Sequence, residues 1–487
     1  MHVSATTSAP ASTDADTVVV GVFDGEEPSP QAPQELRELL ATGEAGRSFK
    51  ALALTHAGDK RWLMVGLGAR DEFTAESARV VAALARERAR ELSTRTLCLQ
   101  APMDCAAEVV AALVEGTILA DYRFERYKSA PAADAGAENR PKQLDRLIIS
   151  SPGATDVIVA ESALVAEAVN AARDLQNRPG NDLTPSALAE HAQALAAEID
   201  ALSVEVDGRE GIGGRKMGAF AAVAQGSEQE PALITLRYDG PGADGPRLGF
   251  VGKAVTFDSG GISLKPGAKM AEMKFDMSGG AAVIEAVAAI ARLKLGVRLV
   301  AVVGATENLP SGRSMKPGDI VTAANGKTIE VNNTDAEGRM VLADCLCHAV
   351  AEGAEQIVDL ATLTGAVIVA LGSTYAGLMV NDEQLARRIS EAGERTGEMV
   401  WRLPLHKEYD ELIKGTYADL DNAPEARKAG TIVGAAFLSN FVGETPWAHL
   451  DIAGSAWDLG RAYVGKGASG YGVRLLVELA RSYASQA

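Results

Sequence analysis

The feature that most constrains the fold is a regular alternation of apolar, strand-like runs with helical stretches in the second half of the chain. The clearest run is RLVAVVG, residues 298–304, which follows a helical pattern over 280–293. Continuous apolar runs of this kind are typical of parallel strands that are covered on both faces. Strands that alternate with helices of this length favour a largely parallel sheet between two helical layers. The other elements predicted here are strands 232–238, 248–257, 329–332 and 356–361, helices 184–199 and 340–351, and a Gly-rich turn at 208–218.

A similar alternation in the first half predicts a separate, smaller α/β domain. The 487 residues leave room for more than one domain. We therefore expect an α/β protein of two domains, the larger being an α/β/α domain around a central, mostly parallel (mixed) sheet. In the first half, strands are expected at 17–23, 61–66, 95–99 and 147–150, and helices at 77–93 and 106–120. The expected division is a disordered N-terminus at 1–16, the N-terminal α/β domain at 17–152, a connecting helix at 153–178 and the larger domain at 179–487.

The charge balance points away from nucleic acid and anionic lipid as partners. The chain has 65 acidic and 47 basic side chains, a formal net charge of −18, which repels phosphate groups. Its four cysteines show no disulfide framework, which fits a reducing compartment, so we expect a cytoplasmic protein. Its six histidines are scattered along the chain. Carboxylates and lysines are therefore the side chains expected to carry any chemistry.

One stretch, residues 360–381, lacks charged side chains as a membrane span would. Its Thr, Ser and Gly residues make it more polar than a helix that crosses hydrocarbon. The prediction is a buried core segment, and no membrane partner is expected. The first sixteen residues also lack the basic and apolar regions of a secretory signal.

Polar residues stand where burial is expected in VGKAVTFDSGGISLKP, residues 251–266. Lys253 lies inside an apolar strand, and Asp258 lies at the end of that strand. A buried ammonium group needs a partner or must lose its proton. One interpretation is a structural ion pair between Lys253 and Asp258. Further along, Asp276 precedes a helical stretch, where the helix dipole by itself would favour an acid.

The second polar segment is NTDAEGR, residues 333–339. In an extended chain, the side-chain period of two would place Asp335, Glu337 and Arg339 on one face. At a helix start, Asp335 would instead be an ordinary N-cap and Glu337 a first-turn acid. The combination of these acids with a lysine inside a strand favours a shared site, because functional groups gather beyond the carboxyl ends of strands in open α/β sheets.

Such a set of residues fits a dinuclear metal site. Carboxylate oxygens shared between two divalent ions can activate a water molecule and hold an oxyanion. A lysine can join as a ligand only as the neutral amine, which a nearby dication would enforce. Lys265 could stay charged and stabilise the developing oxyanion. A two-metal phosphoesterase would use the same carboxylates, but the acid excess disfavours it.

Five blocks occur in one order between residues 251 and 366: VGKAVTFDSGGISLKP, KFDMSGGA, ATENLPSG, NTDAEGRM and DLATLTGA. Together they resemble the leucyl aminopeptidase family of the cytosolic, two-metal type. The resemblance extends to NRPGNDLTP at 177–185. It departs at Met340, where the family usually has Leu, and in the segment 421–430. The resemblance makes 179–487 the expected catalytic peptidase domain.

The resemblance implies a role for each charged residue of these blocks. Lys265 would be a catalytic residue that faces the substrate carbonyl. Arg339 would be a catalytic residue that holds a bicarbonate ion, which acts as the general base. The implied ligands of two divalent metal ions, Mn²⁺ or Zn²⁺, are Lys253, Asp258, Asp276, Asp335 and Glu337, with Asp258 and Glu337 bridging.

By the same resemblance, the activity is release of the N-terminal residue, Leu and other mainly apolar residues, from peptides with a free N-terminus. Bicarbonate would take a proton from the water that bridges the two metals, the resulting hydroxide would attack the carbonyl, and bicarbonate would then pass the proton to the leaving amine. The implied substrate-binding residues are Lys265, Met273, Asn333, Thr362 and Gly365. The resemblance also implies a homohexamer. The alternative is a scaffold or DNA-associated hexamer with incidental peptidase activity, which would need a localised basic surface.

Overall fold

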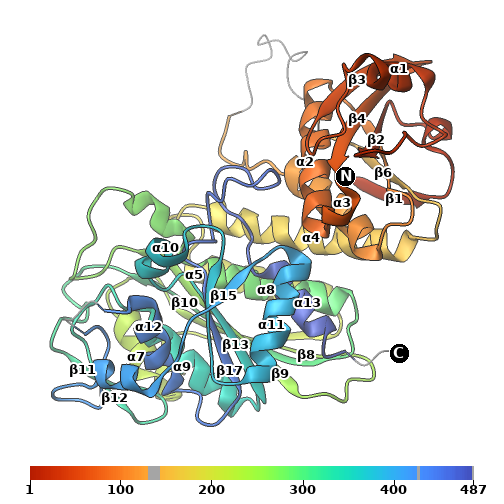
Figure 1. Cartoon of the computed structure of the whole chain (residues 1–487). Helices are drawn as coiled ribbons and strands as arrows, with labels where there is room; N and C mark the ends of the chain where they lie inside the picture. The colour runs from red at the N-terminus through yellow and green to blue at the C-terminus, as the bar shows by residue number, and fades with distance from the viewer. Residues whose placement is uncertain (130–142, 425–427, 485–487) are drawn as a thin grey trace. The chain divides into compact units, whose positions relative to one another are not determined.

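The computed structural model describes residues 1–129, 143–424 and 428–484. These residues form two compact α/β units, which Figure 1 shows with the first unit in red to yellow. The prediction of two α/β domains, the smaller at the N-terminus, is confirmed.

The division between the units falls inside one long helix, α4 (Asp156–Asn177). The first unit is Met1–Glu167 with Gly460–Gly465, and the second is Ala168–Leu459 with the residues from Lys466 onward. Helix α4 occupies the stretch where a connecting helix is predicted.

The first unit contains one six-stranded sheet of order β1-β6-β5-β2-β4-β3. Neighbouring strands are parallel, except that β3 runs antiparallel to β4. Val18 and Val20 of the central strand β2 are buried in a core that includes Leu36. The strands are β1 His2–Thr6, β2 Thr17–Phe23, β3 Leu52–Ala57, β4 Lys60–Gly68, β5 Thr96–Gln100 and β6 Arg146–Ser150. The helices are α1 Gln34–Thr42, α2 Ala75–Glu91 and α3 Ala107–Asp121, with short 3-10 turns η1 Pro10–Ser12 and η2 Arg70–Glu72.

The expectation of a disordered N-terminus at 1–16 is wrong. Strand β1 pairs in parallel with β6 from His2↔Arg146 to Thr6↔Ser150, and η1 follows it. The residues of β1 are exposed or half-buried, so the strand has no buried apolar face that would mark it in the sequence. Its stability comes from backbone hydrogen bonds to β6, which a reading of side-chain patterns does not detect.

The second unit contains an eight-stranded sheet of order β15-β14-β17-β13-β9-β10-β8-β7. The central pairs β10–β9, β9–β13 and β13–β17 are parallel, and antiparallel pairs flank them, so the predicted mixed sheet is confirmed. Its strands are β7 Leu202–Asp207, β8 Ala232–Asp239, β9 Arg247–Asp258, β10 Arg298–Asn308, β13 Gln356–Ala361, β14 Ala376–Val380, β15 Val400–Arg402 and β17 Trp447–Asp451. A three-stranded sheet adds β11 Ile320–Thr322, β12 Thr328–Glu330 and β16 Leu420–Asp421.

Helices cover both faces of the large sheet, as Figure 1 shows for this unit. On one face, Gly252 of β9 meets the backbone of Gly280 in α8; on the other, Gly304 of β10 meets Val341 in α9. A Cβ atom at Gly252 would lie 2.6 Å from the Gly280 Cα, so only glycine permits this approach. The helices are α5 Pro185–Glu198, α6 Arg209–Gly214, α7 Gly218–Ala224, α8 Ser278–Arg292, α9 Gly338–Ala351, α10 Gly365–Leu371, α11 Glu383–Thr396, α12 Gly430–Ser439 and α13 Val473–Arg481, with η4 Met270–Phe275 and η5 Lys407–Ile413.

Two local predictions in this unit are wrong. The Gly-rich stretch 208–218 contains helix α6 and the start of α7, because Ile212 and Met217 are buried in the core and hold the segment in place. The charge-free stretch 360–381 is buried at β13 and β14, but α10 between them is exposed, with Val369 90% accessible. In the described part of the chain, no helix is long and apolar enough to cross a membrane.

Candidate active site

The predicted site residues come together at the carboxyl end of β9 and the start of α9. Lys253 lies within β9, and its side chain passes directly under Gly338, the first residue of α9. A Cβ atom at Gly338 would lie 2.5 Å from Lys253 Nζ. The glycine of the NTDAEGR segment is therefore required so that the helix can begin over the lysine.

An inner cluster forms around Lys253, whose side chain is only 3% exposed. Its Nζ lies 2.9 Å from Asp276 Oδ1 and 2.9 Å from Glu337 Oε1, and it donates a hydrogen bond to the Thr362 carbonyl at 3.1 Å. The interpretation of a Lys253–Asp258 ion pair is wrong, because Lys253 and Asp258 are separated along β9 and Lys253 turns toward α9. We call Lys253, Asp276 and Glu337 the inner cluster.

An outer cluster forms around Lys265, whose side chain is 21% exposed. Its Nζ lies 2.8 Å from Asp258 Oδ2 and 2.6 Å from Asp335 Oδ1. The chain turns back after Asp258 through Gly260 and Gly261, which both have positive φ, of 88° and 65°. This turn returns Lys265 to the strand end that carries Asp258. We call Lys265, Asp258 and Asp335 the outer cluster.

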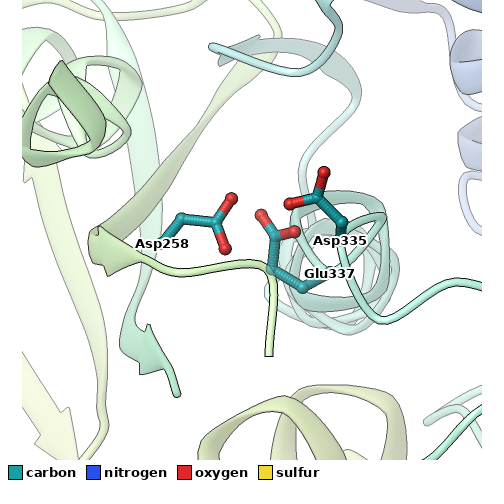
Figure 2. A group of neighbouring side chains, drawn as sticks. All are labelled: Asp258, Asp335 and Glu337. Carbon is teal, nitrogen blue, oxygen red and sulfur yellow. The ribbon is translucent and has the colours of Figure 1, made fainter. Parts of the chain in front are cut away.

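The two clusters meet at three carboxylates. Asp258, Asp335 and Glu337 offer oxygen atoms that all lie within 4.8 Å of one another. Figure 2 shows the three carboxylates directed toward a common point, with Asp258 approaching from β9 and the other two from the entry to α9. Three oxygen donors at this spacing are the arrangement expected of ligands to a divalent cation.

Two carboxylate oxygens support a cation at this point. Asp276 Oδ2 and Glu337 Oε2 are buried and have no hydrogen-bond partner within the described residues. A buried carboxylate oxygen without a partner costs several kcal/mol. The site also holds four carboxylates against two ammonium groups. These observations fit divalent cations held by the carboxylates together with the Lys253 nitrogen.

The ionisation of the site is set by burial and by crowding of like charges. Burial, and then the charge of Asp258, raises the pKa of the Glu337 carboxyl and that of Asp335. Burial likewise raises the pKa of Asp276. Burial alone would lower the pKa of Lys253, but the carboxylates of Asp276, Glu337 and Asp258 outweigh it and raise that pKa. Without a cation, Lys253 is therefore an ammonium group held by its acids.

The local conformation at 333–339 differs from both predicted forms. Glu337 has φ −71° and ψ −37° and is the N-cap of α9, so the extended conformation is wrong there. The helix-start alternative placed the N-cap at Asp335, two residues too early. Asp335 instead lies in a turn in which its N–H donates to Asn333 Oδ1 at 2.9 Å. Asp276 also lies outside a helix, two residues before α8 begins.

Arg339, in the first turn of α9, is buried beside the inner cluster. One guanidinium nitrogen donates to the Asn422 carbonyl at 2.7 Å, while Nε has no hydrogen-bond partner within the described residues. Burial lowers the pKa of this guanidinium, and the charges of Glu337, Asp451 and Asp421 oppose that effect. A buried guanidinium with an unused donor is suited to a small planar oxyanion.

The four remaining predicted residues lie in four different settings. Thr362 contacts the inner cluster, since its hydroxyl donates to Asp276 Oδ1 at 2.7 Å. Asn333 shapes the turn that presents Asp335. Gly365, the first residue of α10, borders open space, and Met273 is half-buried in η4. Substrate contact by these residues stays a prediction.

Three further residues hold the site and were not predicted to do so. Asn308, at the end of β10, donates to Asp258 Oδ1 at 2.8 Å, and its place after a buried strand was a usable signal. Asp451 accepts hydrogen bonds from the N–H of Leu363 at 3.2 Å and the hydroxyl of Thr364 at 2.5 Å. Asn422 gave no sequence signal, because it lies in a segment with no recognised pattern.

The fold and the site define a class of protein: an α/β protein whose converging carboxylates are suited to divalent cations. Comparison with known proteins gives the family. The model of the cytosol aminopeptidase family catalytic domain matches residues 170–477, and that of the family's N-terminal domain matches residues 19–131. The chain belongs to the cytosol aminopeptidase family and is a metal-dependent aminopeptidase.

Individual relatives are similar to this chain over nearly its whole length. A protein of Roseiflexus castenholzii described as a probable cytosol aminopeptidase is 45% identical, over 99% of both chains. A solved structure of the bottromycin maturation enzyme BotP in complex with Mn has a TM-score of 0.86 at 35% identity, covering 96% of this chain and 99% of that one. A variant of tomato leucine aminopeptidase has a TM-score of 0.87 at 34% identity, covering 99% and 96%.

Proposed function

We propose that this aminopeptidase releases Leu and other mainly apolar residues from the N-terminus of peptides, using two divalent cations and bicarbonate. The observation that carries the proposal is the convergence of Asp258, Asp335 and Glu337 between two lysines in different surroundings. Two cations, Mn²⁺ or Zn²⁺, would supply a hydroxide nucleophile and polarise the scissile carbonyl. The complex of BotP with Mn supports Mn²⁺ as one suitable ion.

The chain's own residues then divide the work. Asp258 and Glu337 would be shared by the two ions, Asp335 and Asp276 would each add carboxylate oxygens, and Lys253 would ligate as the neutral amine. Gly338 lies directly over Lys253 and has no Cβ atom that would displace the lysine from this position. Lys253 would lose its proton beside a dication, because the positive charge would lower the pKa that the carboxylates raise.

Lys265 keeps its proton and donates to the substrate carbonyl oxygen. Its partial exposure and its position on a loop leave it able to reach a substrate, and its ammonium group stabilises negative charge that develops on that oxygen. Arg339 holds the bicarbonate through its unused Nε donor, so the general base is an anion rather than a side chain.

The substrate's N-terminal side chain is proposed to lie near Met273, Asn333, Thr362 and Gly365. The open space beside Gly365 supports this placement, since it leaves volume next to the exposed helix α10. We also propose a cytoplasmic location and a homohexamer, as the names of the relatives and the family resemblance suggest. The oligomer is tested by measuring the mass of the assembly in solution.

The activity is tested by release of the chromophore from a leucine anilide after chelation and reloading with Mn²⁺ or Zn²⁺, with and without bicarbonate. We expect turnover with metal, a rise on adding bicarbonate, and none with the N-acetylated anilide, which lacks a free amine. Turnover of the N-acetylated compound, or full turnover after chelation, would contradict the proposal. A loss of the bicarbonate effect in an Arg339→Lys variant would support the role of Arg339.

A further inference from the structure

Asn422 is a fully buried residue that lies directly after β16. Its Oδ1 accepts hydrogen bonds from the backbone N–H groups of Asn332 at 2.8 Å and Asn333 at 3.1 Å. Its Nδ2 donates to the Asn333 carbonyl at 2.7 Å and lies 3.5 Å from the Ala336 carbonyl. One carboxamide thus binds the backbone on both sides of the turn that leads into α9.

That turn carries two of the three converging carboxylates, Asp335 and Glu337. From its other side, the turn is tied to the end of β9 by Thr334, whose hydroxyl donates to the Gly260 carbonyl at 2.6 Å. Asn308 adds a hydrogen bond from its Nδ2 to the Thr334 carbonyl at 3.0 Å. The loop is therefore held between the β9 turn on one side and Asn422 on the other.

The backbone of Asn422 reaches a further part of the site. Its carbonyl accepts the hydrogen bond from the Arg339 guanidinium at 2.7 Å. Its Nδ2 also lies 3.5 Å from the sulfur of Met340, the position at which this chain departs from the usual leucine. A single residue therefore contacts the loop before α9, the guanidinium in its first turn and the side chain after it.

A clamp of this kind is needed because the carboxylates repel one another. Asp258, Asp335 and Glu337 lie within 4.8 Å, and like charges at that distance favour an open loop when no cation is bound. A carboxamide suits the task, since it is the side chain that offers an acceptor and a donor in one plane. An aspartate of the same shape would keep the acceptor, lose the donor and face the Asn333 carbonyl with a negative charge.

We propose that Asn422 is a positioning residue that holds Asp335 and Glu337 in the conformation that binds metal. The proposal rests on the metal ligands assigned under the proposed function, but not on the peptidase reaction. Residues that orient metal ligands typically change metal affinity by about 10- to 100-fold when they are replaced.

The test is a titration of chelated protein with Mn²⁺ alone, in which the free ion is measured by electron paramagnetic resonance. We expect Asn422→Asp and Asn422→Ala to bind Mn²⁺ at least about tenfold more weakly than the wild type. The matched control is Asn381→Asp, because Asn381 also uses both ends of its amide on backbone groups, the Trp447 N–H at 2.6 Å and the Thr445 carbonyl at 3.1 Å. Binding by the Asn422 variants within twofold of the wild type would overturn the proposal.

Hydrogen–deuterium exchange in the wild-type protein provides a second test that needs no folded variant. The N–H groups of Asn332 and Asn333 are expected to exchange slowly in chelated and in Mn²⁺-loaded protein alike, because their acceptor is Asn422. Fast exchange in the chelated protein that slows only with Mn²⁺ would show that the ion holds the loop, and would overturn the proposal. Neither test measures peptide cleavage, so failure of the proposed reaction leaves both intact.

Discussion

The inner and outer clusters each place one lysine between two carboxylates, with one buried acid in both, Asp276 and Asp258, but they differ in the burial of the lysine and of the second acid. Lys253 and Glu337 are 3% and 1% exposed, whereas Lys265 and Asp335 are 21% and 32% exposed. A buried ammonium group that neighbours vacant carboxylate oxygens can readily give way to a cation and become a ligand. A partly solvated one can keep its charge for the substrate. We propose that this difference in burial is the reason why two chemically identical side chains have different roles.

The largest effect is expected from the inner cluster. Glu337→Gln should lower kcat/KM by more than about 1,000-fold, because it removes a converging carboxylate and leaves Lys253 with one acid. Mn²⁺ titration and anilide kinetics are the measurements. Glu398→Gln is the matched control, since Glu398 is equally buried but caps α13 through Gly472 and Leu475. The control should lose thermal stability and keep Mn²⁺ binding; equal activity in the two variants would break the comparison.

Substitution of the lysine in the outer cluster should lower kcat and leave the metal content unchanged. Lys265→Ala is expected to lower kcat by about 100- to 1,000-fold while bound metal stays at the wild-type level, because its ammonium group acts on the substrate oxygen. Metal analysis beside steady-state kinetics separates the two effects. Loss of metal together with activity would show that Lys265, like Lys253, is needed for metal binding. The two lysines would then have the same role.

A smaller effect is expected from the residue that holds the loop of Thr362. Asp451→Asn should weaken Mn²⁺ binding by about tenfold, because Asp451 holds Leu363 and Thr364 while Thr362 contacts both Asp276 and Lys253. Asp359→Asn is the control: Asp359 is as buried, but it binds Trp447 and His449 instead. Unchanged Mn²⁺ affinity in Asp451→Asn would show that the loop of Thr362 does not support metal binding by the inner cluster.

Asp344 provides a reference acid on α9 that faces no cation. Its carboxylate accepts N–H groups of Phe220 and Ala324, and burial raises its pKa to about 6. A raised carboxyl pKa means that the folded state binds the proton more tightly than the unfolded state does. The contribution of this group to the free energy of unfolding is therefore lost as pH rises through that value. The free energy of unfolding of the wild type, relative to that of Asp344→Asn, should fall by about 1 kcal/mol between pH 5 and pH 7.5. Denaturant unfolding of both proteins at both pH values measures this difference. An increase in the difference with pH would show that the pKa of Asp344 is lowered and not raised.

Sequence patterns predict the parts of this molecule that depend on local order. The buried runs that become β9 and β10, and the polar residues that end them, are visible because burial and alternation are local properties. The pairing of each lysine with its acids is not visible in the sequence, since Lys253 and Asp276 meet only after the chain forms the η4 turn. Edge strand β1 and the Asn422 clamp are also invisible, because both act through backbone groups far away in the sequence.

The central claim is that the converging carboxylates bind two divalent cations on which the aminopeptidase activity depends. The most direct measurement is the Mn²⁺ content per chain after chelation and reloading, made on the wild type and on Asp335→Asn alongside leucine anilide turnover. We expect two ions per chain and turnover in the wild type, with fewer ions and little turnover in the variant. Full turnover by metal-free wild type, or by Asp335→Asn with both ions retained, would contradict it.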